Sequence, residues 1–428
     1  MSLKIAIIGA GPAGCMLARL LLQSQQLVSV AIFEGEKSLD FRSQGGTLDL
    51  HDTTGQKALK TAGLFDEFKK HARYDGEALK ITDKKLLAYV NQRGSSDSIK
   101  IGSRPEIDRP QLREMLFNSL PASTVRWNKK LTSVVRVSTR DELTLHFADG
   151  TVENKFDLIV GADGAWSKVR TLLTDEKPYF SGIGGHSFYI PDAQERTPEL
   201  YNLVNCGSVF SWSDGKSIMA QYMGEGSINI SAWGLRSSDW QQTCGHDVHD
   251  PKAVKEACLQ DYAGWDPKLV AFTQIADDDT IAPRDLYMLP VGHKWDHVPG
   301  VTLIGDAAHL MTPFAGEGVN LAFEDCLKLS EVILSTAAAA ASTTSAIDST
   351  QLLHDKVRAF EQDMFTRARE TQQMTYDMMT AMYMNPSAPR IGIEKYILRA
   401  MEGELGKVAT WCLTPVVYLY YFVFKLIW

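Results

Sequence analysis

The sequence lacks an excess of basic residues and a Cys-x-x-Cys pair. It carries 44 Lys and Arg against 52 Asp and Glu, and this net charge of −8 argues against a nucleic-acid scaffold. A mean hydropathy of −0.15 excludes a protein with many membrane spans. The six cysteines are scattered: Cys15, Cys206, Cys244, Cys258, Cys326 and Cys412. Their spacing argues against a zinc module or a disulfide framework and fits a reducing compartment. The first apolar strand pattern begins at Ile5, so we expect no signal peptide and a cytoplasmic location.

The 428 residues, of which 44% are hydrophobic, are enough for two or three domains with a large buried core. Residues 5–8 and 28–33 are apolar runs typical of buried parallel strands, and residues 16–22 between them predict a helix. Strand, helix and strand within about thirty residues form a βαβ unit. Two further buried strands are predicted at 156–160 and 301–304.

The middle and the end of the chain differ from this pattern. Short, partly alternating segments separated by Gly and Asp-Gly turns predict an antiparallel sheet over residues 179–280. Residues 334–350 are rich in Ala, Ser and Thr, and their low complexity predicts a flexible surface insertion. From Leu353 to Met382, apolar residues recur every three or four positions, which indicates one long helix with its methionines in the core.

The first motif that carries chemistry is Gly9-x-Gly11-x-x-Gly14, between the first strand and its helix. Gly9 permits a tight turn, Gly11 lets the backbone approach a pyrophosphate, and Gly14 allows the helix to pack closely on the strand. Glu34 lies twenty residues after Gly14, at the end of the second strand, where a carboxylate accepts hydrogen bonds from a ribose diol. This combination predicts a dinucleotide site and does not distinguish NAD from FAD.

Two further motifs follow buried strands. Asp163-Gly164 comes directly after the strand at 156–160, where an Asp-Gly pair by itself usually marks a turn. Gly305-Asp306 comes after the strand at 301–304 and leads into a glycine-rich turn and another helix. Asp306 is suited to accept hydrogen bonds from a ribityl chain, and the N-terminus of that helix is suited to face a flavin carbonyl.

In this order and spacing the three motifs resemble the class A FAD-dependent monooxygenases, the aromatic-hydroxylase family. A closer resemblance, over most of residues 4–385, is to the tetracycline-inactivating monooxygenases of the TetX type. The residues that carry it are 45–51 (Gly-Gly-Thr-Leu-Asp-Leu-His), 55–56 (Gly-Gln), 107–113 (Ile-x-Arg-x-x-Leu-Arg), 167–170 (Ser-Lys-Val-Arg) and 305–316 (Gly-Asp-Ala-Ala-His-Leu-Met-x-Pro-Phe-Ala-Gly).

The resemblance implies an α/β fold, with a Rossmann-like FAD-binding domain interleaved with an antiparallel-sheet substrate domain, then a long C-terminal helix and an apolar tail. The expected boundaries are 1–66, 99–178 and 282–333 for the FAD-binding domain, 67–98 and 179–281 for the substrate domain, 334–350 for the insertion and 351–428 for the C-terminal part. The residues expected at FAD are Gly9, Gly11, Ala13, Gly14, Glu34, Gly46, Asp49, Arg109, Asp163, Asp306, Pro313, Gly316, Gly318 and Asn320.

The resemblance also implies the chemistry: FAD as cofactor, NADPH as a transient co-substrate, and O2 activated as a flavin C4a-hydroperoxide, with no metal site. Hydroxylation, epoxidation and Baeyer–Villiger insertion share that intermediate, so the sequence does not choose among them. Two alternatives stay open. One is a flavin-dependent dehydrogenase or reductase without oxygen insertion, and the other is a flavoprotein that binds without catalysis. The Trp-x-Trp-x-Ile-Pro element of flavin halogenases is absent from the sequence.

Aromatic and polar side chains in the predicted substrate half suit a small, polycyclic, moderately apolar organic substrate. The pocket candidates are Gln44, His186, Gln221, Asn229, Phe314 and Gly316, together with Phe188 and Trp233. Where the tetracycline enzymes present an Arg and a His toward the drug, this sequence carries Ser217 and Asn229. That departure argues against tetracycline as the natural substrate.

The chain ends in an apolar tail, residues 411–428 (WCLTPVVYLYYFVFKLIW). The uncharged stretch from Val408 to Phe424 is interrupted by Pro415 and ends at Lys425, so it is shorter than the roughly twenty residues of a full membrane span. Two interpretations stay open. The tail is either a helix packed on the protein or on another subunit, or an interfacial membrane anchor through residues 409–428 with Tyr and Trp at headgroup depth.

Overall fold

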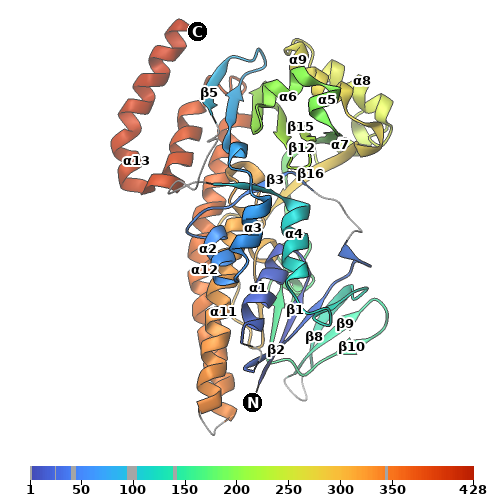
Figure 1. Cartoon of the computed structure of the whole chain (residues 1–428), viewed down its shortest axis with the longest axis vertical. Helices are drawn as coiled ribbons and strands as arrows, with labels where there is room; N and C mark the ends of the chain where they lie inside the picture. Colours follow the sequence, from blue (N-terminus) through green and yellow to red (C-terminus); the bar gives the residue numbers. More distant parts are fainter. Residues whose placement is uncertain (1, 25, 40–44, 94–103, 138–141, 343–345) are drawn as a thin grey trace. The chain divides into compact units, whose positions relative to one another are not determined.

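The computed structural model describes residues 2–24, 26–39, 45–93, 104–137, 142–342 and 346–428. The chain forms two compact units, each assembled from three stretches of sequence (Figure 1). The first unit comprises Met1–Ala72, Ile101–Tyr179 and Tyr287–Gln372, and the second comprises Arg73–Lys100, Phe180–Leu286 and Gln373–Trp428.

A five-stranded parallel sheet forms the core of the first unit, in the order β17-β11-β1-β2-β7. The apolar runs predicted from the sequence become its strands because both faces of a parallel sheet are covered by other elements. The bounds are Leu3–Ile8 for β1, Val28–Phe33 for β2, Val125–Arg126 for β7, Leu158–Gly161 for β11 and Val301–Leu303 for β17.

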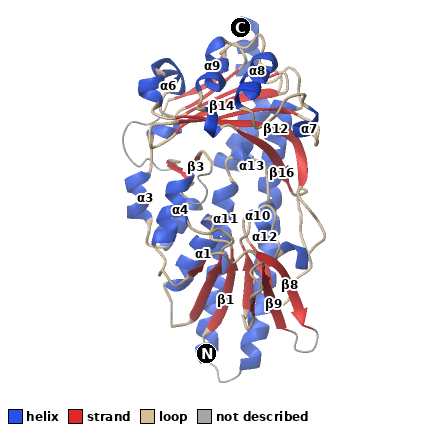
Figure 2. Cartoon of the chain, turned by 90° about the vertical axis from the view of Figure 1, so that its right-hand side faces the viewer, coloured by secondary structure: helices blue, strands red, loops and turns tan. Residues whose placement is uncertain are grey.

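Helices and two small sheets complete the first unit, and Figure 2 shows its parallel strands side by side with helices beside them. Helices α1 and α11 pack on each other, and the Cys326 thiol donates to the Ala13 carbonyl at 3.2 Å. The helices are α1 Pro12–Leu22, α2 Gly55–Thr61, α3 Phe65–His71, α4 Arg109–Asn118, α10 Asp306–His309 and α11 Gly318–Ser342. The small sheets are β3 Thr47–Asp49 with β6 Glu106–Asp108, and β8 Leu131–Val137 with β9 Glu142–Phe147 and β10 Val152–Glu153.

A seven-stranded sheet forms the core of the second unit, in the order β16-β12-β15-β14-β13-β4-β5. Its described pairings are antiparallel except β4 with β13, which confirms the antiparallel sheet predicted from the alternating segments. The strands are β4 Leu79–Thr82, β5 Ala88–Gln92, β12 Tyr179–Ile190, β13 Ser208–Ser213, β14 Lys216–Tyr222, β15 Ile228–Leu235 and β16 Ala282–Met288.

One face of this sheet is covered by helices, because alternate residues of its strands are apolar. Phe188, Ile218 and Ile230 pack there in one cluster with Val254 of α8 and Phe272 of α9. The helices of this region are α5 Ala193–Arg196, α6 Pro198–Val204, α7 Trp240–Thr243, α8 Pro251–Asp261 and α9 Pro267–Ile275.

The structure corrects the expected insertion at 334–350. In its described part, α11 continues to Ser342 and α12, Ala346–Tyr383, begins shortly after. Alanine has the highest helix propensity, so an Ala-rich stretch extends a helix rather than interrupting it. The long helix predicted over 353–382 is confirmed, and its methionine stripe is buried at Met364, Met378 and Met382.

The chain ends in α13, Ile393–Ile427, which bends sharply at Gly406. Gly406 has a φ of 80° and a ψ of 163°, so α13 consists of two helical halves. The halves run antiparallel, because Lys425 near the end of the second half forms a 2.5 Å ion pair with Glu394 at the start of the first. This helical hairpin is the red segment of Figure 1 that carries the C-terminus.

Candidate functional site

The three motifs meet at one edge of the parallel sheet because their strands end in register. Ile8 of β1 pairs with Phe33 of β2 on one side and with Gly161 of β11 on the other, and Gly161 pairs with Leu303 of β17. Each motif begins one or two residues beyond this line, and so does Glu34. The carboxyl ends of parallel strands are where such sheets bind ligands, so the strand register itself assembles the site.

The glycine loop after β1 leaves room at one of its three glycines. A Cβ on Gly9, which has a φ of +104°, would lie 2.4 Å from the Ala162 carbonyl oxygen, and a Cβ on Gly14 would lie 2.0 Å from the Gly9 oxygen. No described atom lies within 4 Å of the corresponding position on Gly11, which caps α1. Gly9 and Gly14 therefore serve chain packing, while the open space at Gly11 and the helix N-terminus behind it fit a phosphate group.

Glu34 connects the end of β2 to the glycine loop. One carboxylate oxygen accepts the Ala10 amide at 2.7 Å, and the other accepts the Glu36 amide at 2.9 Å. Glu36 in turn forms a 2.7 Å ion pair with Arg113 of α4. Each Glu34 oxygen keeps a second lone pair, so a carboxylate held in this way retains the capacity to bind ribose hydroxyls.

Asp163 orders its own turn. Its carboxylate accepts the Ser167 hydroxyl at 2.6 Å and the Lys168 amide at 2.7 Å. Burial raises the pKa of Asp163, and these hydrogen bonds partly offset that shift. The side chain predicted to lie at the cofactor is thus engaged within its own loop, which it holds in shape.

Arg170 joins the second motif to the third, a role that the sequence analysis missed. Its guanidinium is buried and donates to the Ala307 carbonyl at 3.0 Å and to the Ala165 carbonyl at 2.6 Å. Burial lowers the pKa of Arg170, and the carboxylates of Asp163 and Asp306 oppose that shift. The Ser-Lys-Val-Arg segment therefore connects the turns after β11 and β17.

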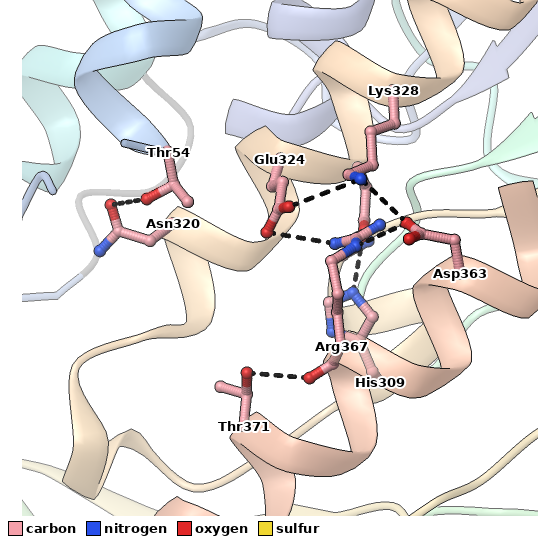
Figure 3. Close-up of polar contacts among 10 residues, drawn as sticks. Thr54, His309, Asn320, Glu324, Lys328, Asp363, Arg367 and Thr371 are labelled. Atoms are coloured by element: carbon pink, nitrogen blue, oxygen red, sulfur yellow. Dashed lines mark hydrogen bonds and ion pairs between the residues drawn. The ribbon is translucent and has the colours of Figure 1, made fainter. Parts of the chain in front are cut away.

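An ionic network with a buried centre at Asp325 lies behind the third motif (Figure 3). Asp325 of α11 accepts the Gly305 amide at 3.1 Å and the His309 Nε2 hydrogen at 2.6 Å. Arg367 of α12 donates to Asp325 at 3.1 Å and to Asp363 at 2.8 Å. His309 is therefore a paired structural histidine, and the network fixes the turn that presents Asp306 as an exposed carboxylate.

Asn320 ties the loop after β3 to α11. Its amide oxygen accepts the His51 amide at 2.9 Å, and its amide nitrogen donates to the Asp49 carbonyl at 2.9 Å. The side chain is fully buried, and the Thr54 hydroxyl also reaches it, as Figure 3 shows. A Cβ on Gly316 would lie 3.1 Å from the Asp49 carboxylate, so the turn at Gly316 lies close to the loop that Asn320 holds.

The remaining predicted cofactor residues line the exposed side of the same region. Arg109 begins α4, is exposed, and its amide donates to the Gly46 carbonyl at 3.3 Å. Pro313 is exposed at the start of a short 3₁₀ turn, and a Cβ on Gly318 would meet no described atom within 4 Å. Ala13, in contrast, is engaged in the contact between α1 and α11. All fourteen residues predicted at FAD belong to the first unit.

The substrate candidates in the second unit fall on opposite faces of its sheet. Gln221 and Asn229 are directly paired neighbours on β14 and β15, both half-buried, and Asn229 also pairs with Tyr189 of β12. His186 is three residues from Tyr189, so side-chain alternation along the strand places it on the other face. Phe188 lies on that same face, in the helix-covered core.

His186 is therefore a core residue, which corrects its place among the pocket candidates. It is 6% exposed, its ring lies edge-on to Trp240, and Nε2 donates to the Val248 carbonyl at 3.1 Å. Burial lowers the pKa of His186 to about 4, and the hydrogen bond to Val248 partly opposes that shift. Phe314 is half-buried in the first unit, and Gln44 lies outside the described residues.

Ser217, one of the two positions that argue against tetracycline in the sequence, is also covered. Its hydroxyl is fully buried and forms a 2.5 Å hydrogen bond with the Tyr383 hydroxyl at the end of α12. Burial raises the pKa of Tyr383. A buried serine paired with a neutral tyrosine provides no cationic group for a substrate.

Known proteins match this chain over most of its length. Residues 2–220 and 293–349 match the FAD binding domain family. The monooxygenase asqM of Emericella nidulans is 31% identical over 422 residues, which cover 87% of this chain and 94% of asqM.

Solved structures share the fold at low sequence identity. A Klebsiella pneumoniae HpxO complexed with FAD has a TM-score of 0.73 at 18% identity and covers 97% of this chain and 99% of its own. The tetracycline destructase Tet(51) has a TM-score of 0.63 at 18% identity and covers 96% and 98%. These matches confirm the resemblance inferred from the three motifs.

Proposed function

This chain belongs to the FAD binding domain family of monooxygenases, and from that premise we propose that it uses NADPH and O2 to hydroxylate or epoxidise a polycyclic, natural-product-like small molecule. The observation that carries the proposal is the shared register line of β2, β1, β11 and β17, beyond which the three motifs converge. The enzyme is an FAD-dependent monooxygenase, and its donor, substrate class and type of oxygen transfer are what we propose.

We assign the parts of FAD to residues along this edge. The open position at Gly11 and the N-terminus of α1 receive the pyrophosphate, and Glu34 receives the ribose of the adenosine half. Asp306, exposed beyond β17, receives the ribityl chain. Pro313 and Gly316, on the turn before α11 that the Gly316 amide closes onto the Pro313 carbonyl, would lie at the isoalloxazine ring.

Bound at this edge, FAD would supply the redox chemistry that links oxidation of the nicotinamide to activation of O2. The task of the chain is to hold the cofactor rigidly and to keep water from the reacting atoms. Glu34, Asn320 and the Asp325 network contribute to the first task, because each fixes a loop at the sheet edge through buried or half-buried hydrogen bonds.

For the substrate, we propose contacts from the sheet face that carries Gln221 and Asn229. Both amides are half-buried side by side, and the indole of Trp233 lies on the same face of β15. Two amides beside an aromatic surface suit a flat molecule with a few polar groups. Phe314 and Gly316 stay predicted contacts on the flavin side.

Labelled oxygen tests the reaction class. The FAD-loaded enzyme is screened with NADPH against polycyclic natural products, and any compound that stimulates NADPH consumption is incubated under 18O2. We expect one labelled oxygen atom in the product. Substrate conversion without label would favour the dehydrogenase alternative, and flavin binding without stimulated NADPH consumption would favour a binding protein.

We also propose that residues 409–428 associate with a membrane surface. In the described part of the chain, α13 qualifies as a candidate membrane helix by length and composition, although the bend at Gly406 divides it, and only 11% of its most apolar stretch is buried. A soluble-core helix of this composition would be covered by protein.

A further inference from the structure

The second half of α13 concentrates the exposed apolar surface of the protein. Among the described residues, more than half of the exposed large apolar side chains lie at or after Leu405. Val408, Trp411, Leu426 and Trp428 are each at least 70% exposed. Isolated apolar side chains on a surface are ordinary, but a continuous helix face of this kind marks an interaction site.

This half-helix has two sides. On the inner side, the buried Tyr421 hydroxyl donates to the Tyr89 carbonyl of β5 at 3.1 Å, and the Phe424 ring lies 5.1 Å from the Tyr89 ring. On the outer side, Cys412, Leu419 and Leu426 are exposed and spaced seven residues apart, so they lie along one line of the helix. The helix is therefore seated on the protein along one stripe and unpartnered along the other.

We propose that this half-helix lies in the plane of a bilayer surface, with the line Cys412-Leu419-Leu426 among the acyl chains and the Tyr421 stripe kept on β5. The inference rests on the membrane association proposed above and specifies its geometry. The inner side of the half-helix then stays in contact with β5 while its outer side lies in the bilayer. The tail therefore binds lipid without leaving the protein.

The width and composition of the outer face favour lipid over a second protein chain. At 100° per residue, the exposed apolar positions from Tyr418 through Leu426 to Tyr420 span about 200° of the helix, whereas a partner helix covers a narrower seam. Trp411 and Trp428 lie near its two ends, and tyrosines lie on its flanks. Indole and phenol rings prefer the headgroup boundary, where one edge is apolar and the other wet.

A membrane-spanning arrangement fits the structure less well. The seventeen uncharged residues from 408 to 424 rise about 26 Å as a helix, short of the roughly 30 Å hydrocarbon core. Spanning would also pull Lys425 away from Glu394, its 2.5 Å partner, and would break the Tyr421 hydrogen bond to Tyr89. An in-plane helix keeps both contacts.

The charges of α13 predict whether the protein needs anionic lipid to bind a vesicle. The helix carries four basic and three acidic residues, so its attraction to anionic headgroups is small. We expect the full-length, FAD-loaded protein to bind vesicles of neutral phosphatidylcholine, with little change between low and high salt. Binding that requires anionic lipid and disappears in salt would overturn an insertion driven by apolar contact.

Depth measurements separate the in-plane from the spanning geometry. Versions of the full chain with one accessible cysteine carry an environment-sensitive fluorophore at Cys412, at L419C or at L426C. Cys206 and Cys244 are replaced by serine in all three, and Cys412 is replaced by serine in the last two. Brominated lipids with the bromine at known depth then quench the label in phosphatidylcholine vesicles. We expect equal, shallow depths at all three sites. A label at 419 that lies deeper than those at 412 and 426 would show a spanning helix and overturn the proposal.

A matched pair of substitutions tests the outer face. Leu419→Glu should lower the vesicle partition coefficient in flotation roughly tenfold to a hundredfold, because a charge replaces an inserted leucine. Leu259→Glu makes the same change at an isolated leucine of α8 that is 51% exposed, and it should float like the wild type. If Leu419→Glu floats unchanged, or if it instead abolishes a dimer seen by sedimentation without lipid, the outer face does not bind lipid.

Catalysis is measured on the same preparations so that the two proposals fail separately. The flavin absorption spectrum and substrate-stimulated NADPH consumption of Leu419→Glu, without vesicles, should equal those of the wild type. A protein that floats with equal label depths but consumes no NADPH contradicts the catalytic proposal alone. Active enzyme that does not float contradicts the membrane association, and unequal label depths contradict only the in-plane geometry.

Discussion

The two sheets of this protein place functional side chains by different rules. In the parallel sheet of the first unit, residues that follow Ile8, Phe33, Gly161 and Leu303 gather at one edge, because these four residues lie in register. In the antiparallel sheet of the second unit, what matters is the face on which a side chain lies, and successive residues of a strand alternate between the two faces. Asn229 lies on one face of β15, and Ile230 lies on the helix-covered face.

The difference shows where the spacing of residues in the sequence is enough to predict the position of a side chain. A motif at the end of a parallel strand lies at the ligand edge whichever way its neighbours point. In an antiparallel strand, a shift of one residue moves a side chain to the opposite face. His186 illustrates this, since it was predicted to line a pocket and lies in the core.

The largest loss of stability is expected at Gly14, where the glycine loop packs against its own backbone at Gly9. Gly14→Ala places a Cβ 2.0 Å from the Gly9 oxygen and should destabilise the protein by about 3 kcal/mol, measured as a lower urea midpoint. Gly11→Ala is the matched control, because no described atom lies near its Cβ. It should keep the wild-type midpoint and weaken FAD binding roughly tenfold. Equal stability losses at both positions would contradict the separate roles of the two glycines.

Burial of His186 on the helix-covered face of the second sheet should make the stability of the protein depend on pH. The folded pKa of His186 is lowered to about 4, from 6.5, so the unfolded chain takes up a proton first as the pH falls. Stability is therefore lost between about pH 6.5 and pH 4, and this residue contributes about 2–3 kcal/mol of that loss. In urea titrations at pH 7.5, 6 and 4.5, His186→Gln should begin less stable and lose correspondingly less on acidification. Parallel curves for variant and wild type would show that His186 is accessible to protons in the folded state.

The smallest effect is expected on the face of the same sheet that carries Asn229, and it concerns substrate binding rather than stability. Asn229→Ala should raise the KM for the compound that stimulates NADPH consumption by about tenfold, with the flavin spectrum unchanged, because one hydrogen bond to the substrate is lost. Ile230→Val, one residue along β15, should lower stability by about 1 kcal/mol and leave KM unchanged. A KM effect at position 230 but not at 229 would reverse the assignment of the two faces.

Much of the first unit could be predicted because its signals are local. Gly9, Gly11 and Gly14 stand at fixed spacing after an apolar run, and Asp306 follows another, so strand ends and turns can be recognised one at a time. The roles of Arg170, Asn320 and Asp325 could not be predicted in this way. Each acts across elements far apart in sequence, and nothing in the residues around Asp325 indicates a bond to the Gly305 amide twenty positions earlier.

The sequence by itself determined the cofactor motifs, the alternation that builds the second sheet and the apolar composition of the tail, because these depend on neighbours in the chain. Only the tertiary structure decided that Asp163 is engaged in its own turn, that His186 is buried, and that the tail uses Tyr421 against Tyr89 while Leu419 and Leu426 face outward. Burial and partnership are properties of what packs against a residue, and for these residues the partner lies elsewhere in the fold.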